Sequence, residues 1–239
     1  MPNKRRGAHP ADAMLFADGQ LARLRAAVVD FSWLMERDYG HDSSLKLVGD
    51  RYALTARQRV TVVRASCSDR QRSQRVGCRL SVSEVAGKPL WVDGFNLITT
   101  IEAALGVGVI FMGRDGCVRD MASMHGNYRL LADTQAAIEM ILAQLTRLAP
   151  SSVHWYLDRP VSNNGRLKTV LLENAIDLEF ETTVELVSDP DVILRDAKLP
   201  HIVVSADSQI LDRCEAWFPL AEAVVRERRV PWIDFSGQV

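Results

Sequence analysis

The sequence predicts an α/β fold, with a parallel β-sheet covered by helices on both faces and preceded by a small all-α domain. Apolar residues make up 47% and charged residues 25% of the 239 residues, which is typical of a folded globular protein. Residues 1–79 show the apolar spacing of helices. Residues 88–239 alternate short apolar runs with helical stretches, which indicates βαβ units. We place the domain boundary in the Gly- and Ser-containing stretch between these two parts.

The front part is expected to contain three helices. Apolar residues recur at three- and four-residue steps between Gln20 and Arg37, the period of an amphipathic helix. A short helix is predicted over 44–48. Thr55 is placed to cap a further helix, which we expect to continue to about Arg75. The last two resemble a helix-turn-helix only loosely, and no residue there identifies a base-reading surface.

The charges are divided unevenly along the chain. Residues 1–79 carry 15 of the 29 Lys and Arg but only 8 of the 30 Asp and Glu. Eight arginines lie between Arg51 and Arg79, with Asp69 the single acid among them. This asymmetry predicts a basic surface that meets a polyanion such as nucleic acid. The alternative is that these arginines form a solvated face or pair with acidic groups of the protein.

In the back part, apolar runs and helical stretches follow one another in βαβ order. A hairpin is expected after the first helix, where residues 107–112 precede Gly113-Arg-Asp-Gly. The expected strands are 90–92, 153–157, 184–187, 201–204 and 231–235, and the expected helices are 97–105, 166–176, 209–211 and 220–226.

An aspartate follows four of these apolar runs: Asp93, Asp158, Asp189 and Asp207. The carboxyl ends of parallel strands lie along one edge of a sheet, about 4.8 Å apart, so these side chains are expected to meet. Clustered carboxylates repel one another unless a cation neutralises them, and oxygen ligands favour Mg²⁺ or Mn²⁺. Such a site suits phosphoryl chemistry. Taken singly, each aspartate is also explained as a turn residue or a helix N-cap.

Three segments carry a resemblance to a known superfamily. Leu90–Ile98 resembles the first strand and turn of PIN-like nucleases, particularly the NYN branch, where Asp-Gly-x-Asn follows an apolar strand. Val153–Asp158 and Val203–Leu211 are similar to later strand ends of the same superfamily. The whole chain resembles an uncharacterised bacterial and archaeal family that joins a helical domain of unknown function to a PIN-like domain. The segments that match this family are Ser44–Tyr52, Gly113–Asp120 and Leu157–Asn163.

The resemblance implies a metal-dependent nuclease that hydrolyses phosphodiester bonds, most often in RNA. It assigns metal binding to Asp93 and Asp207 and a site-shaping role to Asn96, with Ser205 beside them. PIN-like nucleases usually place a further acid on a middle helix, and no residue here matches it directly. The candidates for that acid are Asp158, from a strand, and Glu102, Asp115 and Asp120.

Two further segments hold polar residues that suit a phosphate. Ser162, Asn163 and Arg166 stand between a predicted strand and helix, where amides and charge attract anions. The same residues also fit a turn and an N-cap. Arg119 and Arg129 are expected to grip substrate phosphate. His125 could shuttle a proton, but a lone histidine is more often a surface or core residue.

The alternatives to a nuclease are a non-catalytic nucleic-acid-binding module with a degenerate site and a small-molecule phosphoesterase. Nucleotide-binding, serine-hydrolase and zinc-protease motifs are missing from the sequence. No apolar run is long enough for a membrane helix, no secretory signal is visible, and the four cysteines form no CxxC pair, which together predict a cytoplasmic protein. The sequence leaves the oligomeric state open, with a homodimer as one option.

Overall fold

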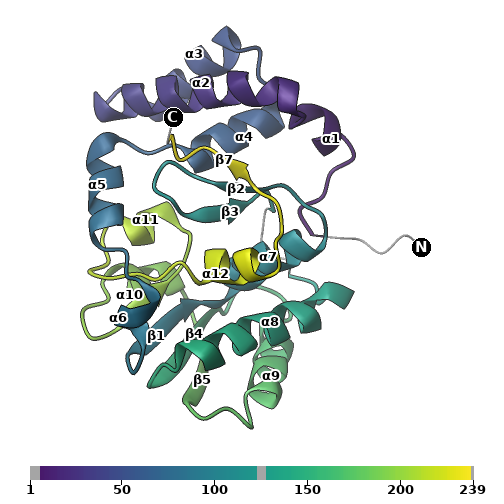
Figure 1. The fold of residues 1–239 in the computed structure, drawn as a ribbon, viewed down its shortest axis with the longest axis vertical. Helices are drawn as coiled ribbons and strands as arrows, with labels where there is room; N and C mark the ends of the chain where they lie inside the picture. The colour runs from purple at the N-terminus through teal and green to yellow at the C-terminus, as the bar shows by residue number, and fades with distance from the viewer. Residues whose placement is uncertain (1–5, 123–127, 238–239) are drawn as a thin grey trace.

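A four-stranded parallel sheet with strand order β5-β4-β1-β6 lies at the centre of the back part of the chain (Figure 1). The computed structural model describes residues 6–122 and 128–237. The strands of this sheet are β1 (Pro89–Asp93), β4 (Ser152–Asp158), β5 (Glu181–Val187) and β6 (Ile202–Val204). Because β1 and β4 are the inner strands, the residues that follow them are flanked by neighbours on both sides.

Helices cover both faces of this sheet, which confirms the predicted α/β class. Alternate residues such as Leu90, Val92 and Trp155 face one large core with α7 (Gly94–Leu105), α8 (Ala132–Leu148), α9 (Asn164–Asn174) and α12 (Leu220–Glu227). Tyr156 and Val203 face the opposite core with α10 (Pro190–Arg195) and α11 (Ser208–Leu211). The two-residue period of a strand explains why neighbouring residues enter different cores.

A second, three-stranded sheet lies beside the first. β2 (Ile110–Met112) and β3 (Val118–Asp120) form the antiparallel hairpin that the sequence predicts. The last strand, β7 (Ile233–Asp234), runs parallel to β2 and belongs to this second sheet rather than to the main one. The amide of Phe235 extends the pairing by donating to the Met112 carbonyl at 2.9 Å.

The front part is helical, as expected, but its helices are divided differently. Thr55 begins a helix through a capping box with Gln58, as predicted. That helix ends at Ala65, and Ser68 forms a second capping box that starts a new one, so the prediction of one helix to Arg75 is wrong. None of the helices in the described ranges has both the length and the apolarity to cross a bilayer. The front helices are α1 (Asp12–Leu15), α2 (Asp18–Glu36), α3 (His41–Arg51), α4 (Ala56–Ala65), α5 (Asp69–Gly77) and α6 (Val82–Val85).

The front helices share a hydrophobic core with the second sheet. Phe31 of α2 and Val62 of α4 are fully buried in one cluster with Phe111, Met121 and Phe235. Figure 1 shows the consequence: α2 and α4 lie along the side of the hairpin that faces away from the parallel sheet. The front part therefore packs directly on the β2–β3 hairpin. This hairpin leads toward the carboxyl edge of the main sheet.

Candidate functional site

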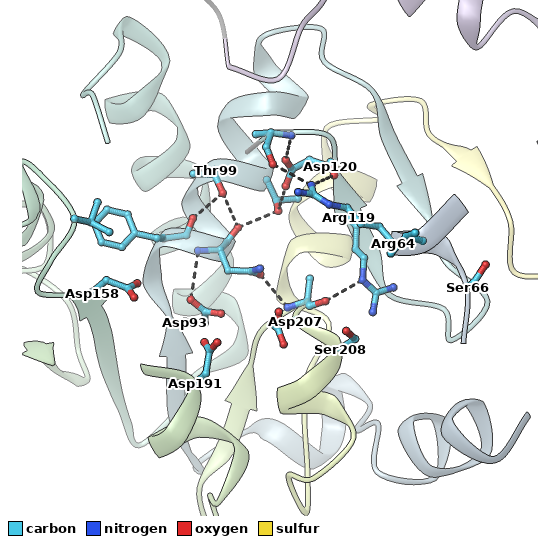
Figure 2. A pocket seen from close by; sticks show the side chains of 17 residues that line it. Arg64, Ser66, Asp93, Thr99, Arg119, Asp120, Asp158, Asp191, Asp207 and Ser208 are labelled. Carbon is cyan, nitrogen blue, oxygen red and sulfur yellow. Dashed lines mark hydrogen bonds between the residues drawn. The ribbon is translucent and has the colours of Figure 1, made fainter. Parts of the chain in front are cut away.

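A cavity of about 420 Å³ opens at the carboxyl edge of the parallel sheet, and four of the five aspartates that line it follow or end strands of this sheet (Figure 2). Asp93 ends β1, Asp158 ends β4, and Asp207 follows β6. The fourth, Asp191, stands in the first turn of α10. The structure therefore brings three of the strand-end aspartates selected from the sequence to one place. We call this site the acidic cavity.

Asp93 is the most enclosed of the four, with only 6% of its surface exposed. Its Oδ2 accepts a hydrogen bond from the Ser205 hydroxyl at 2.8 Å, and its Oδ1 accepts one from the Asn96 amide at 3.4 Å. The pKa of Asp93 is raised to about 7, chiefly by burial and in part by the charges of Asp191 and Asp207, which together outweigh the lowering effect of the Ser205 hydrogen bond. Asp93 is thus a carboxylate held in place but not neutralised.

Gly94 explains how Asp93 comes to lie so close to the next strand. A Cβ added to Gly94 would lie 2.5 Å from Leu157 Cδ2 and 3.1 Å from the Tyr156 carbonyl oxygen. Only glycine lets α7 begin against β4 at this distance. The Asp-Gly pair is therefore more than a turn dipeptide, because it fixes the first helix of the site against an inner strand.

The turn between β6 and α11 is tied to the first strand by side-chain bonds. The Ser205 hydroxyl accepts from the Asp207 amide at 3.0 Å while it donates to Asp93. Asn96 Oδ1 accepts from the Ala206 amide at 2.9 Å. Asp207 Oδ1 accepts from the amides of Gln209 and Ile210, which caps α11. Asn96 and Ser205 thus occupy the shaping positions expected of them.

Asp191 takes the place at the cavity that the sequence analysis gave to Asp189. The Asp189 carboxylate caps α10 by accepting from the amides of Asp191 and Val192, and it does not line the cavity. Burial, followed by the charges of Asp207, Asp189 and Asp158, raises the pKa of Asp191 to about 6, although the residue is open to solvent. Burial and Asp189 likewise raise the pKa of Asp158.

The donor set of the acidic cavity fits a divalent cation in its chemistry. Four carboxylates face one space, and the pKa of three of them is raised, first by burial and then by the charges of neighbouring carboxylates, which a bound cation would offset. Oxygen ligands of this kind suit Mg²⁺ or Mn²⁺. Within the described ranges no three Asp, Glu, His or Cys side chains already converge as a complete ligand set. Binding would therefore draw the carboxylates closer together.

Arg119 has a different role from the one predicted. Its Nη1 and Nη2 donate to the two carboxylate oxygens of Asp115 at 2.8 and 2.7 Å, and its Nε donates to the Ala206 carbonyl at 2.9 Å. With only 7% of its surface exposed, the side chain braces the β6–α11 turn rather than offering a free fork to a phosphate. The expectation that it grips substrate is corrected accordingly.

Asp115 is also excluded as the further acid. Arg75 Nη1 donates to Asp115 Oδ2 at 2.7 Å, so this carboxylate has two arginine partners. Burial alone would raise the pKa of Asp115, but the ion pairs with Arg119 and Arg75 outweigh it and hold the pKa far below its usual range. We call Arg75, Asp115 and Arg119 the buried ion cluster.

The other candidate acids lie at different places. Asp120 lines the cavity, is buried, and accepts from the Thr100 hydroxyl at 2.7 Å. Burial raises the pKa of Asp120. Glu102 does not line the cavity; it pairs with Arg6 and accepts from Tyr128 and Thr134. His125 lies outside the described residues.

The remaining predicted phosphate ligands do not line the acidic cavity. Ser162 and Asn163 both donate to the Tyr128 carbonyl, and Asn163 adopts the left-handed conformation just before α9. Arg129 and Arg166 are exposed to solvent. Val161, in the loop before α9, lines the cavity. Asn163 stands at the N-cap position of α9, but its side chain forms no capping hydrogen bond with any residue of the described helix, so both side chains bind the Tyr128 carbonyl instead.

Most arginines of residues 51–79 are engaged within the protein. Six of the eight pair with carboxylates: four pair within the front part, and Arg75 and Arg79 pair with acids of the back part. The pairs are Arg51–Asp30, Arg57–Asp12, Arg59–Asp50, Arg70–Asp38, Arg75 with Asp115 and Asp212, and Arg79–Glu222. Arg64 differs from these six, because it enters the wall of the acidic cavity from the last turn of α4.

The fold and the site define an α/β protein with an acidic cavity at the carboxyl edge of a parallel sheet. The chain belongs to the family described as a domain of unknown function, DUF5616, whose model matches residues 82–223. A second model, described as a protein of unknown function, DUF434, matches residues 23–77. These descriptions name no activity, so the PIN-like resemblance stays a prediction.

A relative from an archaeon extends over most of the chain. The uncharacterized protein MJ0935 of Methanocaldococcus jannaschii is 27% identical over 188 residues, which cover 79% of this chain and 88% of that protein. No solved structure matches the chain. The relative therefore spans parts of both family regions rather than the back part alone.

Proposed function

We propose that the protein is a Mg²⁺- or Mn²⁺-dependent nuclease of the cytoplasm that hydrolyses phosphodiester bonds, with RNA as the favoured substrate. The observation that supports this most is the convergence of Asp93, Asp158, Asp191 and Asp207 on one cavity. Their carboxylates come from four separate stretches of chain, and burial, together with the charges of neighbouring carboxylates, raises the pKa of Asp93 to about 7 and that of Asp191 to about 6. The resemblance of the strand-end segments to PIN-like nucleases points the same way.

Each side chain of the site would have a distinct role in positioning the carboxylates around a cation. A bound divalent cation would supply Lewis acidity toward phosphate oxygens and increase the acidity of water. Ser205 orients Asp93 through its hydroxyl, and Asn96 fixes the turn that presents Asp207. The amides of α11 bind one oxygen of Asp207, which leaves Oδ2 to face the cavity. Asp158 and Asp191 complete the acidic wall.

The test is cleavage of an end-labelled single-stranded RNA in the presence of Mg²⁺ or Mn²⁺. Asp93→Asn and Asp207→Asn are expected to reduce the rate at least about 100-fold, since each removes a charge needed for cation binding. The matched control is Asp189→Asn, a nearby carboxylate outside the cavity, which should retain activity. Cleavage that persists in a chelator, or in both cavity variants, would contradict the proposal. Binding of RNA without cleavage would favour the non-catalytic module.

The size of the cavity gives a second candidate, a small-molecule phosphoesterase. About 420 Å³ lies within the range of about 300–1,000 Å³ for small-molecule sites. Turnover of mononucleotides or sugar phosphates faster than RNA, with the same loss in Asp93→Asn, would select this candidate.

A further inference from the structure

We propose that Arg64 binds the phosphate group of the substrate, so that the front helices supply one wall of the active site. The inference rests on the proposed function in one respect only, namely that a phosphate ester enters the acidic cavity. It assigns a role to a residue from the DUF434-matching region in a site whose aspartates all come from the DUF5616-matching region.

Arg64 is held in position by the second sheet. Its Nη1 donates to the Asp120 carbonyl at 2.7 Å and to the Ala122 carbonyl at 2.9 Å, just after β3. In residues 6–122 and 128–237, Nε and Nη2 of Arg64 form no hydrogen bond, which leaves donors for a ligand. A guanidinium anchored through one nitrogen is preorganised to bind phosphate oxygens with the others.

Arg64 also keeps its charge available. Arg119, the other arginine on the cavity wall, is neutralised by both oxygens of Asp115. Among the described residues no carboxylate forms an ion pair with Arg64. The carboxylate of Asp120, whose carbonyl Arg64 contacts, accepts from the Thr100 hydroxyl and forms no ion pair with Arg64. Burial raises the pKa of Asp120, and the charge of Arg64 lowers it by a smaller amount.

Three of the cavity aspartates lie on the opposite side of the view from Arg64 (Figure 2). In Figure 2, Arg64 and Asp120 lie on one side of the view, and Asp158, Asp93 and Asp191 lie on the other. Val63 and Ser66 accompany Arg64 on the cavity lining, so a whole turn of α4 and the residues that follow it form this wall. A phosphate between the two walls would meet the acidic wall and its cation on one side and the guanidinium on the other.

Calorimetric titration with adenosine 5′-monophosphate in Mg²⁺ measures this contact without requiring cleavage. Arg64→Met is expected to raise the Kd at least about 10-fold, because a charge-assisted bond to phosphate is lost. Arg64→Lys should recover part of the affinity, since it restores the charge without the planar fork. Arg72→Met is the matched control. It removes the same charge from the neighbouring helix at a residue that does not line the cavity.

Arg64→Met also removes two bonds to carbonyls, so the melting temperature of each variant is measured alongside. Equal affinity in the wild type and a folded Arg64→Met variant would overturn the inference, as would equal losses in Arg64→Met and Arg72→Met. A wild type that does not bind the nucleotide overturns it too. RNA cleavage that depends on Asp93 but not on Arg64 would leave the nuclease proposal standing and reject the role of Arg64 alone.

Discussion

Asp93 and Asp115 are both buried aspartates near the β6–α11 turn, yet their surroundings are opposite. Asp115, in the buried ion cluster, is 1% exposed and contacts two arginines. Asp93, in the acidic cavity, is 6% exposed and has a serine hydroxyl and an amide as its partners, with other carboxylates nearby. The pKa of Asp115 lies far below its usual range, whereas that of Asp93 is raised to about 7.

The difference shows that burial of an acid does not distinguish a structural role from a functional one. What distinguishes them is whether the charge is already neutralised by the protein. In the buried ion cluster Asp115 is neutralised by two arginines, Arg75 is also paired with Asp212, and Arg119 braces the turn through the Ala206 carbonyl. With the residues that the structure describes, the carboxylates of the acidic cavity form no such ion pairs, so a bound cation would have to neutralise them. Each prediction below tests one side of this contrast.

The largest effect is expected for Asp115→Asn. The change leaves Arg75 and Arg119 buried together without their shared carboxylate, and breaking a buried pair in this way costs about 3–5 kcal/mol. Urea unfolding of the variant and the wild type measures the loss. A variant within about 1 kcal/mol of the wild type would mean that the cluster is not the structural element we describe.

The next effect is the pH dependence of stability, measured in a chelator so that no cation binds. Because the folded pKa of Asp93 is raised to about 7 from an ordinary value of 3.8, folding is favoured when this carboxyl is protonated. The contribution of Asp93 is therefore full below about pH 4 and is lost as the pH rises toward 7, by an amount on the order of 2–4 kcal/mol. Asp93→Asn should remove most of this dependence. An unchanged pH profile in that variant would contradict the raised pKa.

A smaller effect is expected from adding the cation. At pH 7.5, free Mn²⁺ at ten times its Kd should stabilise the wild type by about 1.4 kcal/mol, or roughly 3–6 °C in Tm. Asp93→Asn and Asp207→Asn should lose this shift, whereas an exposed surface variant such as Asp38→Asn should retain it. Thermal denaturation with and without Mn²⁺ provides the measurement, and equal shifts in all four proteins would show that the ion binds elsewhere.

The smallest effect is expected for Asp189→Ala. This change removes the N-cap of α10 and should cost about 1 kcal/mol, with no effect on the response to Mn²⁺. Asp191→Asn should do the reverse, reducing the Mn²⁺ response at little cost in stability. If Asp189→Ala reduced the Mn²⁺ response and Asp191→Asn lowered only the stability, Asp189 would be the cation ligand, as the sequence predicts.

The sequence could predict the strand-end aspartates because the ends of apolar strands are local patterns. Asp93, Asp158 and Asp207 each follow an apolar run, and a parallel sheet brings such ends together. The sequence does not single out Asp191 as a cavity residue, because Asp189-Pro190 is the stronger signal at the N-terminus of α10. Pro190 at the start of α10 places Asp191 in its first turn, and the packing of buried Leu194 decides which side chain turns to the cavity.

Two of the errors elsewhere have their physical origin in contacts distant along the chain. The role of Arg119, in strand β3, depends on Asp115 and also on Arg75, which lies in helix α5. The helix α8 was not anticipated, although Ile138, Ile141 and Leu145 give it a helical period. The place of β7 depends on pairing with β2 across more than 100 residues, which no local pattern encodes.

The position of Phe235 has a consequence for how the chain folds during synthesis. This residue packs against Phe111, with ring centroids 6.0 Å apart, in the core that also contains Phe31 and Val62. The helices α2 and α4 leave the ribosome first, but the apolar surface that they share with the second sheet is closed only after residue 235 has emerged. Until then a nascent chain would expose part of that surface, and exposed apolar surface favours association with other chains.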